Sequence, residues 1–154
     1  MTENGKLKNS VAPASQQEQS RTKGTVLVVG DFKLMRVSLK QSLKPAGYTV
    51  IEAENCSQAL DVLKARGIDL VIMDIKIADT DGLEMVQRIR FNAQTANMPV
   101  IICTASTAVS HLFQVGIQGL LIKPIRPQAV LTLVNKILNP TNGESLQVFG
   151  FTDF

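Results

Sequence analysis

Five apolar runs of strand length alternate with segments of helical spacing from Thr25 onward, and this alternation is the strongest constraint on the fold. Apolar residues three or four positions apart follow each run, as in a helix that lays one face on a sheet. Such βα units predict a parallel sheet covered by helices. We expect strands at Thr25–Val29, Thr49–Ala53, Leu70–Asp74, Val100–Thr104 and Leu120–Ile122.

Helix boundaries are marked between these strands. We expect Ser57 to cap the start of one helix, and Gly47 and Gly67 to follow the ends of others. The last helix is expected at Pro127–Leu138 and ends before Pro140, because proline cannot continue a helix. The sheet-facing residues of the first two helices are expected at Leu34, Val37, Leu39, Leu43, Ala59, Leu60 and Leu63.

The length of 154 residues allows one domain with a real core and is short for two. Residues 1–23 are rich in Ser, Gln, Asn, Lys and Glu, so they bury too little to offset their ordering entropy, and we expect a disordered leader. The domain is expected at 24–139, followed by a C-terminal tail at 140–154. That tail is too short for an output domain, so we expect the domain to stand alone.

Charge and composition narrow the function classes. The net charge of +3 is mild and the basic residues are scattered, so no direct contact with nucleic acid is expected. Cys56 and Cys103 lack metal-ligand spacing and indicate reduced thiols. The amino terminus lacks the apolar core of a signal peptide, and no apolar run approaches the length of a membrane span. We expect a cytoplasmic protein without membrane contact.

Polar side chains stand at the ends of four predicted strands: Asp31, Asp74, Thr104 and Lys123. In a parallel sheet these positions share the carboxyl edge, where open α/β sheets build their sites. Two carboxylates can hold Mg²⁺, and a backbone carbonyl at Lys76 can complete its ligands. A hydroxyl and an ammonium can contact the oxygens of a transferring phosphoryl group. The pattern therefore indicates phosphoryl transfer to an aspartate.

Five sequence blocks carry a family resemblance. They are VLVVGD at 26–31, VIMDI at 71–75, DGLE at 81–84, PVIICTA at 99–105 and KPI at 123–125. In this order and spacing they resemble the CheY-like receiver domains of response regulators. The resemblance implies a flavodoxin-like, doubly wound, five-stranded parallel sheet of order 2-1-3-4-5 with helices on both faces.

The same resemblance implies a function. Asp74 would accept phosphate from a histidine kinase or a histidine phosphotransfer protein, Asp31 would bind Mg²⁺, and Thr104 and Lys123 would contact the phosphoryl group. The chain would then be a single-domain response regulator of a two-component phosphorelay. It would be no enzyme in its own right, and its output would be contact with a downstream protein.

The chain departs from the family pattern at several places. Gly30 stands where the family has the first member of an acidic pair, so we expect weaker Mg²⁺ affinity. Leu120 stands where the family usually has Tyr or Phe as the switch residue, and it has no ring to move. Ile77-Ala78 replaces the usual Met-Pro, and the stretch from Thr104 to Gly116 is about three residues short, or nearly one helical turn. A short or displaced fourth helix is expected.

Two other functions stay open at this point. A receiver that no longer depends on phosphate would act as an interaction module, which Gly30 and Leu120 favour. A dehalogenase-type phosphatase would use Asp79 and Asp81, but it would also need a distal acidic pair, and the only acids after Lys123 are Glu144 and Asp153 in the tail. We expect a structural role for His111, and the Phe-rich end at 149–154 is a frayed terminus or a docking peptide.

Overall fold

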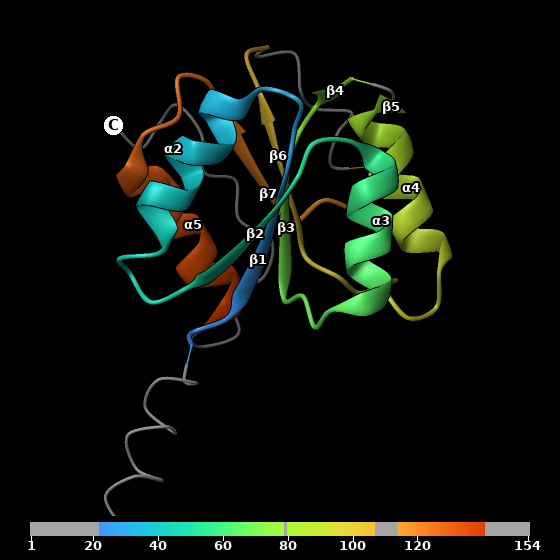
Figure 1. The fold of residues 1–154 in the computed structure, drawn as a ribbon, viewed down its shortest axis with the longest axis horizontal. Helices are drawn as coiled ribbons and strands as arrows, with labels where there is room; N and C mark the ends of the chain where they lie inside the picture. The colour runs from blue at the N-terminus through green and yellow to red at the C-terminus, as the bar shows by residue number, and fades with distance from the viewer. Residues whose placement is uncertain (1–21, 79, 107–113, 141–154) are drawn as a thin grey trace, which may run out of the picture.

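The structure, a computed structural model, describes residues 22–78, 80–106 and 114–140 (Figure 1). Five parallel strands form one sheet in the order β2-β1-β3-β6-β7. The strands are β1 (Thr25–Val29), β2 (Thr49–Ala53), β3 (Leu70–Asp74), β6 (Val100–Thr104) and β7 (Gly119–Ile122). The predicted strands and their order are confirmed, and the last strand begins one residue earlier than expected.

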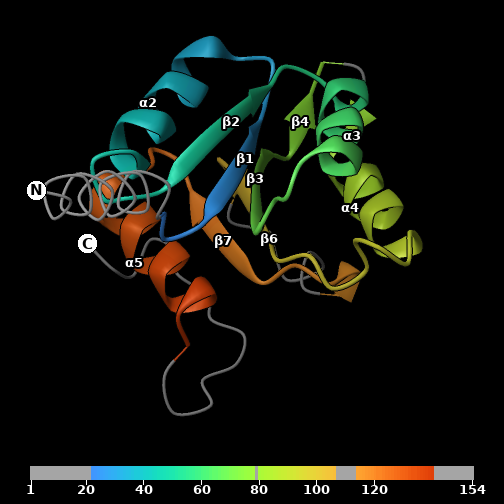
Figure 2. The ribbon, with the colours of Figure 1, turned by 60° about the horizontal axis from the view of Figure 1, so that its bottom comes forward.

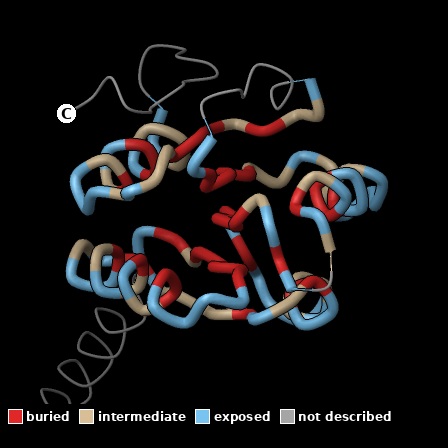
Figure 3. Tube along the Cα trace, turned by 90° about the horizontal axis from the view of Figure 1, so that it is seen from above, coloured by how far each residue is buried: buried red, intermediate tan, exposed pale blue. Residues whose placement is uncertain are grey.

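In the described part of the chain, four helices cover the two faces of the sheet (Figures 1 and 2). They are α2 (Lys33–Leu43), α3 (Cys56–Ala65), α4 (Gly82–Phe91) and α5 (Pro127–Leu138). Val26 and Val28 share a core cluster with buried residues of α2 and α5, and Leu27 and Val29 share one with α3 and α4. Successive side chains of a strand point to opposite faces, so one apolar strand fills both layers. Figure 3 shows burial concentrated between these layers.

The predicted sheet-facing side of α2 is confirmed at Leu39 and Leu43 and wrong at Leu34. Met35, Leu39 and Leu43 are buried at a spacing of four, whereas Leu34 is 68% exposed and Val37 is only partly buried. The buried face thus begins at Met35 rather than at Leu34 and runs through Leu39 and Leu43. The predicted face of α3 is closer to the structure, since Ala59 is buried and Leu60 and Leu63 pack against the core.

The cap of α3 also differs from the prediction. Asn55, in extended conformation, accepts a hydrogen bond from the Gln58 N–H at 2.8 Å through its side-chain oxygen. Ser57 lies inside the helix, so its predicted role as cap is wrong. The helix begins earlier than expected because the Asn55 side chain already satisfies one of the unpaired N–H groups of its first turn.

A small hairpin follows β3 and was not predicted. It pairs β4 (Lys76–Ile77) with β5 (Thr80–Asp81) in antiparallel fashion. Gly82 begins α4 directly behind it and donates its N–H to the Ile75 carbonyl at 2.7 Å. A Cβ atom at Gly82 would lie 2.7 Å from the Asp74 carbonyl oxygen. The chain can therefore turn this closely behind Asp74 only with glycine at this position.

Several predictions fall outside the described residues. The leader does so except for Thr22 and Lys23, which both hydrogen-bond to the Gly47 carbonyl at 3.0 Å. The C-terminal tail after Pro140, His111 and most of the shortened segment before Gly116 also lie outside them. The domain boundaries thus stay predictions. Among the helices of the described ranges, none has the length and hydropathy to cross a membrane.

We predict that Gly82→Ala lowers the free energy of unfolding by about 1–3 kcal/mol, because the added methyl group overpacks against rigid backbone. Its contacts would be the Asp74 and Ile75 carbonyl oxygens at 2.7 and 2.9 Å. Gly67→Ala is the matched control, since a Cβ there meets nothing within 4 Å. Urea unfolding measures both variants, and equal stability of the two would contradict the close approach at Gly82.

Candidate functional site

The parallel register brings the four strand-end side chains to one pocket. Asp74 pairs with Cys103 across β3 and β6, and Thr104 pairs with Ile122 across β6 and β7. Asp31, Asp74, Thr104 and Lys123 all line a pocket of about 460 Å³ at this edge. The structure thus places together the residues that the sequence predicted as neighbours.

Asp74 ends the buried strand β3 and is itself only 6% exposed. Its Oδ2 accepts a hydrogen bond from the Lys123 ammonium at 2.7 Å, and its Oδ1 lies 3.4 Å from the Lys76 N–H. A buried carboxylate without a partner would be strongly destabilising, and the ammonium offsets its charge. Lys123 is half-buried, so this ion pair faces the pocket rather than the core.

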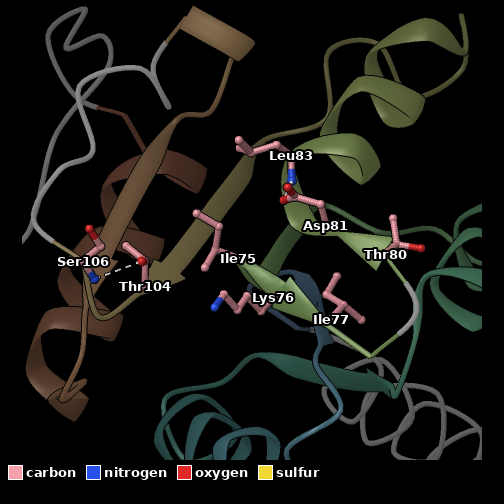
Figure 4. A pocket seen from close by; sticks show the side chains of 8 residues that line it. All are labelled: Ile75, Lys76, Ile77, Thr80, Asp81, Leu83, Thr104 and Ser106. Atoms are coloured by element: carbon pink, nitrogen blue, oxygen red, sulfur yellow. Dashed lines mark hydrogen bonds between the residues drawn. The ribbon is translucent and has the colours of Figure 1, made fainter.

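Thr104 ends β6 and is 2% exposed. Its Oγ1 accepts a hydrogen bond from the Ser106 N–H at 3.1 Å, which fixes the turn after the strand (Figure 4). Its carbonyl accepts the Lys123 N–H at 2.8 Å. Because a hydroxyl can accept and donate at once, this geometry leaves the hydroxyl hydrogen available for an oxygen in the pocket.

A second pocket, of about 620 Å³, continues past Thr104 toward α4. Figure 4 shows its wall, in which the Lys76 side chain points away from Ile77 toward the side formed by Thr104 and Ser106. Ile75, Ile77, Thr80, Asp81 and Leu83 complete the lining. The β4–β5 hairpin therefore forms one wall of the space beside the strand ends.

The donor set suits a hard divalent cation. Asp31 is exposed and lines the same pocket as Asp74. Within the described ranges, no group of three or more His, Cys, Asp or Glu side chains is arranged to hold a metal. Mg²⁺ takes one or two carboxylates and completes its ligands with water and phosphate oxygens, so this pair of aspartates fits it. The role of the Lys76 carbonyl stays a prediction, although Lys76 does line the pocket.

Gly30 is buried beside the site, and its missing side chain leaves no empty space. A Cβ atom there would lie 2.6 Å from the terminal methyl group of Met35 and 3.8 Å from the Asp74 Cβ. Its carbonyl accepts a hydrogen bond from the Arg36 Nη1 at 2.6 Å. Arg36 also pairs through Nε with Glu52 at 3.1 Å.

Sequence reasoning missed Arg36 and Glu52. Arg36 is 6% exposed although it is charged, and it lies on the buried side of α2 between Met35 and Leu39. The available signal was its place next to the buried stripe, where a charged residue needs a partner. Glu52 on β2 supplies that partner.

Leu120 is 1% exposed and belongs to the core cluster on the α3 and α4 face. The position is therefore filled by an aliphatic side chain that points into the protein. The predicted absence of a movable ring follows from the residue type, and its effect on signalling stays a prediction.

Burial raises the pKa of the Cys103 thiol to about 12. The Asp74 carboxylate acts in the same direction, whereas the Lys123 ammonium lowers this pKa. Cys103 therefore stays a protonated thiol, the less reactive form of cysteine, at neutral pH.

Comparison with known proteins gives a consistent picture. The family profile described as "Response regulator receiver domain" matches residues 26–135. The chain is 34% identical over 119 residues to the chemotaxis protein CheY of Bacillus subtilis, covering 74% of this chain and 97% of CheY. It superposes on the chemotaxis response regulator CheY4 of Vibrio cholerae with a TM-score of 0.70 and 27% identity, covering 74% of this chain and 98% of that one.

A third relative is longer. The phosphate regulon transcriptional regulatory protein PhoB of Pseudomonas aeruginosa is 31% identical over 120 residues, which covers 76% of this chain. The match takes in only 52% of PhoB. The similarity to PhoB thus concerns about half of that regulator.

We predict that the free energy of unfolding falls more steeply with pH in the unaltered chain than in Cys103→Ala between pH about 8.5 and 10.5. Below this range the thiol is protonated in both states, and within it the unfolded thiol ionises while the folded one, with its pKa raised to about 12, does not. The difference in slope should approach about 1.4 kcal/mol per pH unit. Urea unfolding at several pH values measures it, and equal slopes would contradict the raised pKa.

Proposed function

The chain belongs to the response regulator receiver domain family, and from this premise we propose that it accepts a phosphoryl group on Asp74 and signals by binding another protein. One observation carries the proposal. The nearly buried Asp74 carboxylate meets the Lys123 ammonium at 2.7 Å in a pocket also lined by Asp31 and Thr104. This is the donor set that phosphoryl transfer to a carboxylate requires.

The proposed reaction is a transfer between two proteins. An Asp74 oxygen attacks the phosphorus of a phosphohistidine, an O–P bond forms, and the P–N bond to the imidazole breaks. The released imidazole nitrogen keeps the electron pair and takes a proton from solvent. Asp31, Asp74 and the Lys76 carbonyl would hold Mg²⁺, which offsets negative charge between the carboxylate and the incoming group.

Thr104 and Lys123 have different roles in this proposal. The Thr104 hydroxyl, which already accepts from Ser106, donates to one phosphoryl oxygen. Lys123 exchanges its contact with the carboxylate for a contact with the phosphoryl group. Both residues are joined through backbone, since the Lys123 N–H donates to the Thr104 carbonyl at 2.8 Å. A shift at one is therefore passed to the other.

The partners are inferred from this chemistry. A histidine kinase or a histidine phosphotransfer protein supplies the phosphoryl group, and a downstream protein reads the altered surface. The output is binding rather than catalysis, and no direct contact with nucleic acid is proposed. Cytoplasmic location and function as a single domain stay predictions.

A phosphorylation-independent interaction module is the second candidate. Gly30 removes one acidic residue from the edge, and Leu120 replaces an aromatic switch residue with a buried aliphatic one. Family membership decides against the dehalogenase-type phosphatase, and Asp79, on which it relied, lies outside the described residues. A labelling experiment separates the two remaining candidates.

We predict that the chain gains one phosphoryl group when incubated with Mg²⁺ and a small phosphodonor such as acetyl phosphate, and that Asp74→Ala gains none. The reason is that Asp74 is the carboxylate that pairs with Lys123 in the pocket that Thr104 and Asp31 also line. Intact mass measures the adduct. A chelator serves as the control for metal dependence, and Asp81→Ala as the control for another acidic residue near the strand ends.

Labelling that persists in Asp74→Ala would sink the assignment of the acceptor. A folded chain that gains no phosphoryl group with Mg²⁺ present would favour the phosphorylation-independent module. The two results are distinct, because the first moves the acceptor to another residue and the second removes the reaction.

We predict that Lys123→Ala is still labelled but loses the conformational response. Without the ammonium, the aspartyl phosphate still forms at Asp74. It has no contact with residue 123 through which to displace β7. Amide chemical shifts before and after phosphorylation measure the response in β7 and the start of α5. Shift changes as large as those of the unaltered chain would show that Lys123 does not couple the site to the fold.

A further inference from the structure

The buried guanidinium of Arg36 bridges two elements beside the candidate metal site. Its Nη1 donates to the Gly30 carbonyl at 2.6 Å, and its Nε donates to Glu52 Oε1 at 3.1 Å. Lys40 contacts the other Glu52 oxygen at 3.4 Å, so the carboxylate is held from two sides. The guanidinium of Arg36 on α2 thus links the end of β1, through the Gly30 carbonyl, to β2, through Glu52.

The hydrogen bond to the Gly30 carbonyl also constrains the next residue, Asp31. The Gly30 carbonyl and the Asp31 N–H belong to one planar peptide group, so an interaction that holds the carbonyl also fixes the plane from which Asp31 departs. Glycine has more backbone freedom than any other residue, and at this position it precedes a predicted metal ligand. The Gly30 N–H is held as well, since it donates to the Ala53 carbonyl at 3.0 Å.

We propose that Arg36 is a positioning residue for Mg²⁺ binding: through the Gly30 carbonyl it orients Asp31 toward the pocket that Asp74 lines. The inference rests on the proposed function, because it requires Asp31 to bind the cation. Arg36 itself contacts neither the cation nor the phosphoryl group. Glu52 acts one step further away by aligning the guanidinium.

The positive charge of Arg36 and its positioning of the Gly30 carbonyl would affect Mg²⁺ affinity in opposite directions. This difference makes the proposal testable. The Arg36 cation lies close to the edge that binds Mg²⁺, so a purely electrostatic role would weaken binding and its removal would strengthen it. A positioning role requires the two-pronged contact, which a lysine cannot reproduce although it keeps the charge. Arg36→Lys and Arg36→Gln therefore separate the two effects.

The experiment measures the Mg²⁺ dissociation constant of the full chain by calorimetric titration with MgCl₂. We expect both Arg36→Lys and Arg36→Gln to raise this constant about tenfold, as removal of an outer partner of a metal ligand commonly does. In ¹H–¹⁵N spectra without metal, the Gly30 and Asp31 amide signals should shift in both variants. Asp31→Asn is the positive control for loss of the ligand.

Arg90 offers the matched control. Its Nη2 also donates to a glycine carbonyl at 2.6 Å, but this is Gly116, ahead of β7 and at the opposite edge of the sheet. Arg90→Lys should therefore lower the melting temperature while leaving the Mg²⁺ constant and the Asp31 amide signal unchanged. If the Arg36 variants do not fold, Glu52→Gln carries the test, with a smaller rise in the constant and the same shifted amides.

The outcomes distinguish this inference from the proposed function. An unaltered chain that binds no Mg²⁺ would overturn both. Mg²⁺ binding in the unaltered chain with the same constant in Arg36→Lys would overturn the positioning role alone. Tighter binding in Arg36→Gln, with no change in Arg36→Lys, would also overturn it and assign Arg36 an electrostatic effect.

Discussion

Parallel backbone pairing is the constraint on which the rest of this structure depends. The strands run in one direction, so their carboxyl ends share an edge, and four of them deliver a polar group there. The ladder continues past the strand ends, where the Ile75 N–H bonds to the Cys103 carbonyl and the Lys123 N–H to the Thr104 carbonyl. A slip of one residue would turn Asp74 to the other face of the sheet and break its contact with Lys123.

Charged side chains are buried near this edge, and burial of a charge carries a desolvation penalty. The structure limits this penalty in the same way for two residues. Asp74 and Arg36 are both 6% exposed. Each is paired with a counter-charge that is less buried, namely Lys123 and Glu52. The more exposed partner keeps contact with solvent, which limits the desolvation penalty of the pair. The Asp74 pair opens on the pocket, whereas the Arg36 pair ties α2 to β2.

The sequence was informative where one pattern dominated. The strands are mostly apolar, with Glu52 of β2 as an exception, and the strand-end residues Asp31, Asp74, Thr104 and Lys123 follow from where the apolar runs stop. The face of α2 was predicted only in part because Leu34 and Met35 are adjacent apolar residues, and contact with the sheet decides which of them is buried. The β4–β5 hairpin has two residues in each strand, too few for any periodicity to reveal. Arg36 was missed because an arginine on a helix is normally solvated, and its burial depends on Glu52 from a distant segment.

At Gly30, the space that a side chain would occupy is filled by a neighbouring residue. The methyl group of Met35 lies where a side chain at position 30 would begin, 2.6 Å from an added Cβ. Met35 belongs to the core cluster between the sheet, α2 and α5, and its flexible end would have to move aside to admit a side chain at position 30. An acidic residue at 30 would therefore compete with Met35 for space as well as add charge. Asp31 is thus the single carboxylate at this strand end, and the Arg36 bond to the preceding carbonyl connects it with the buried side of α2.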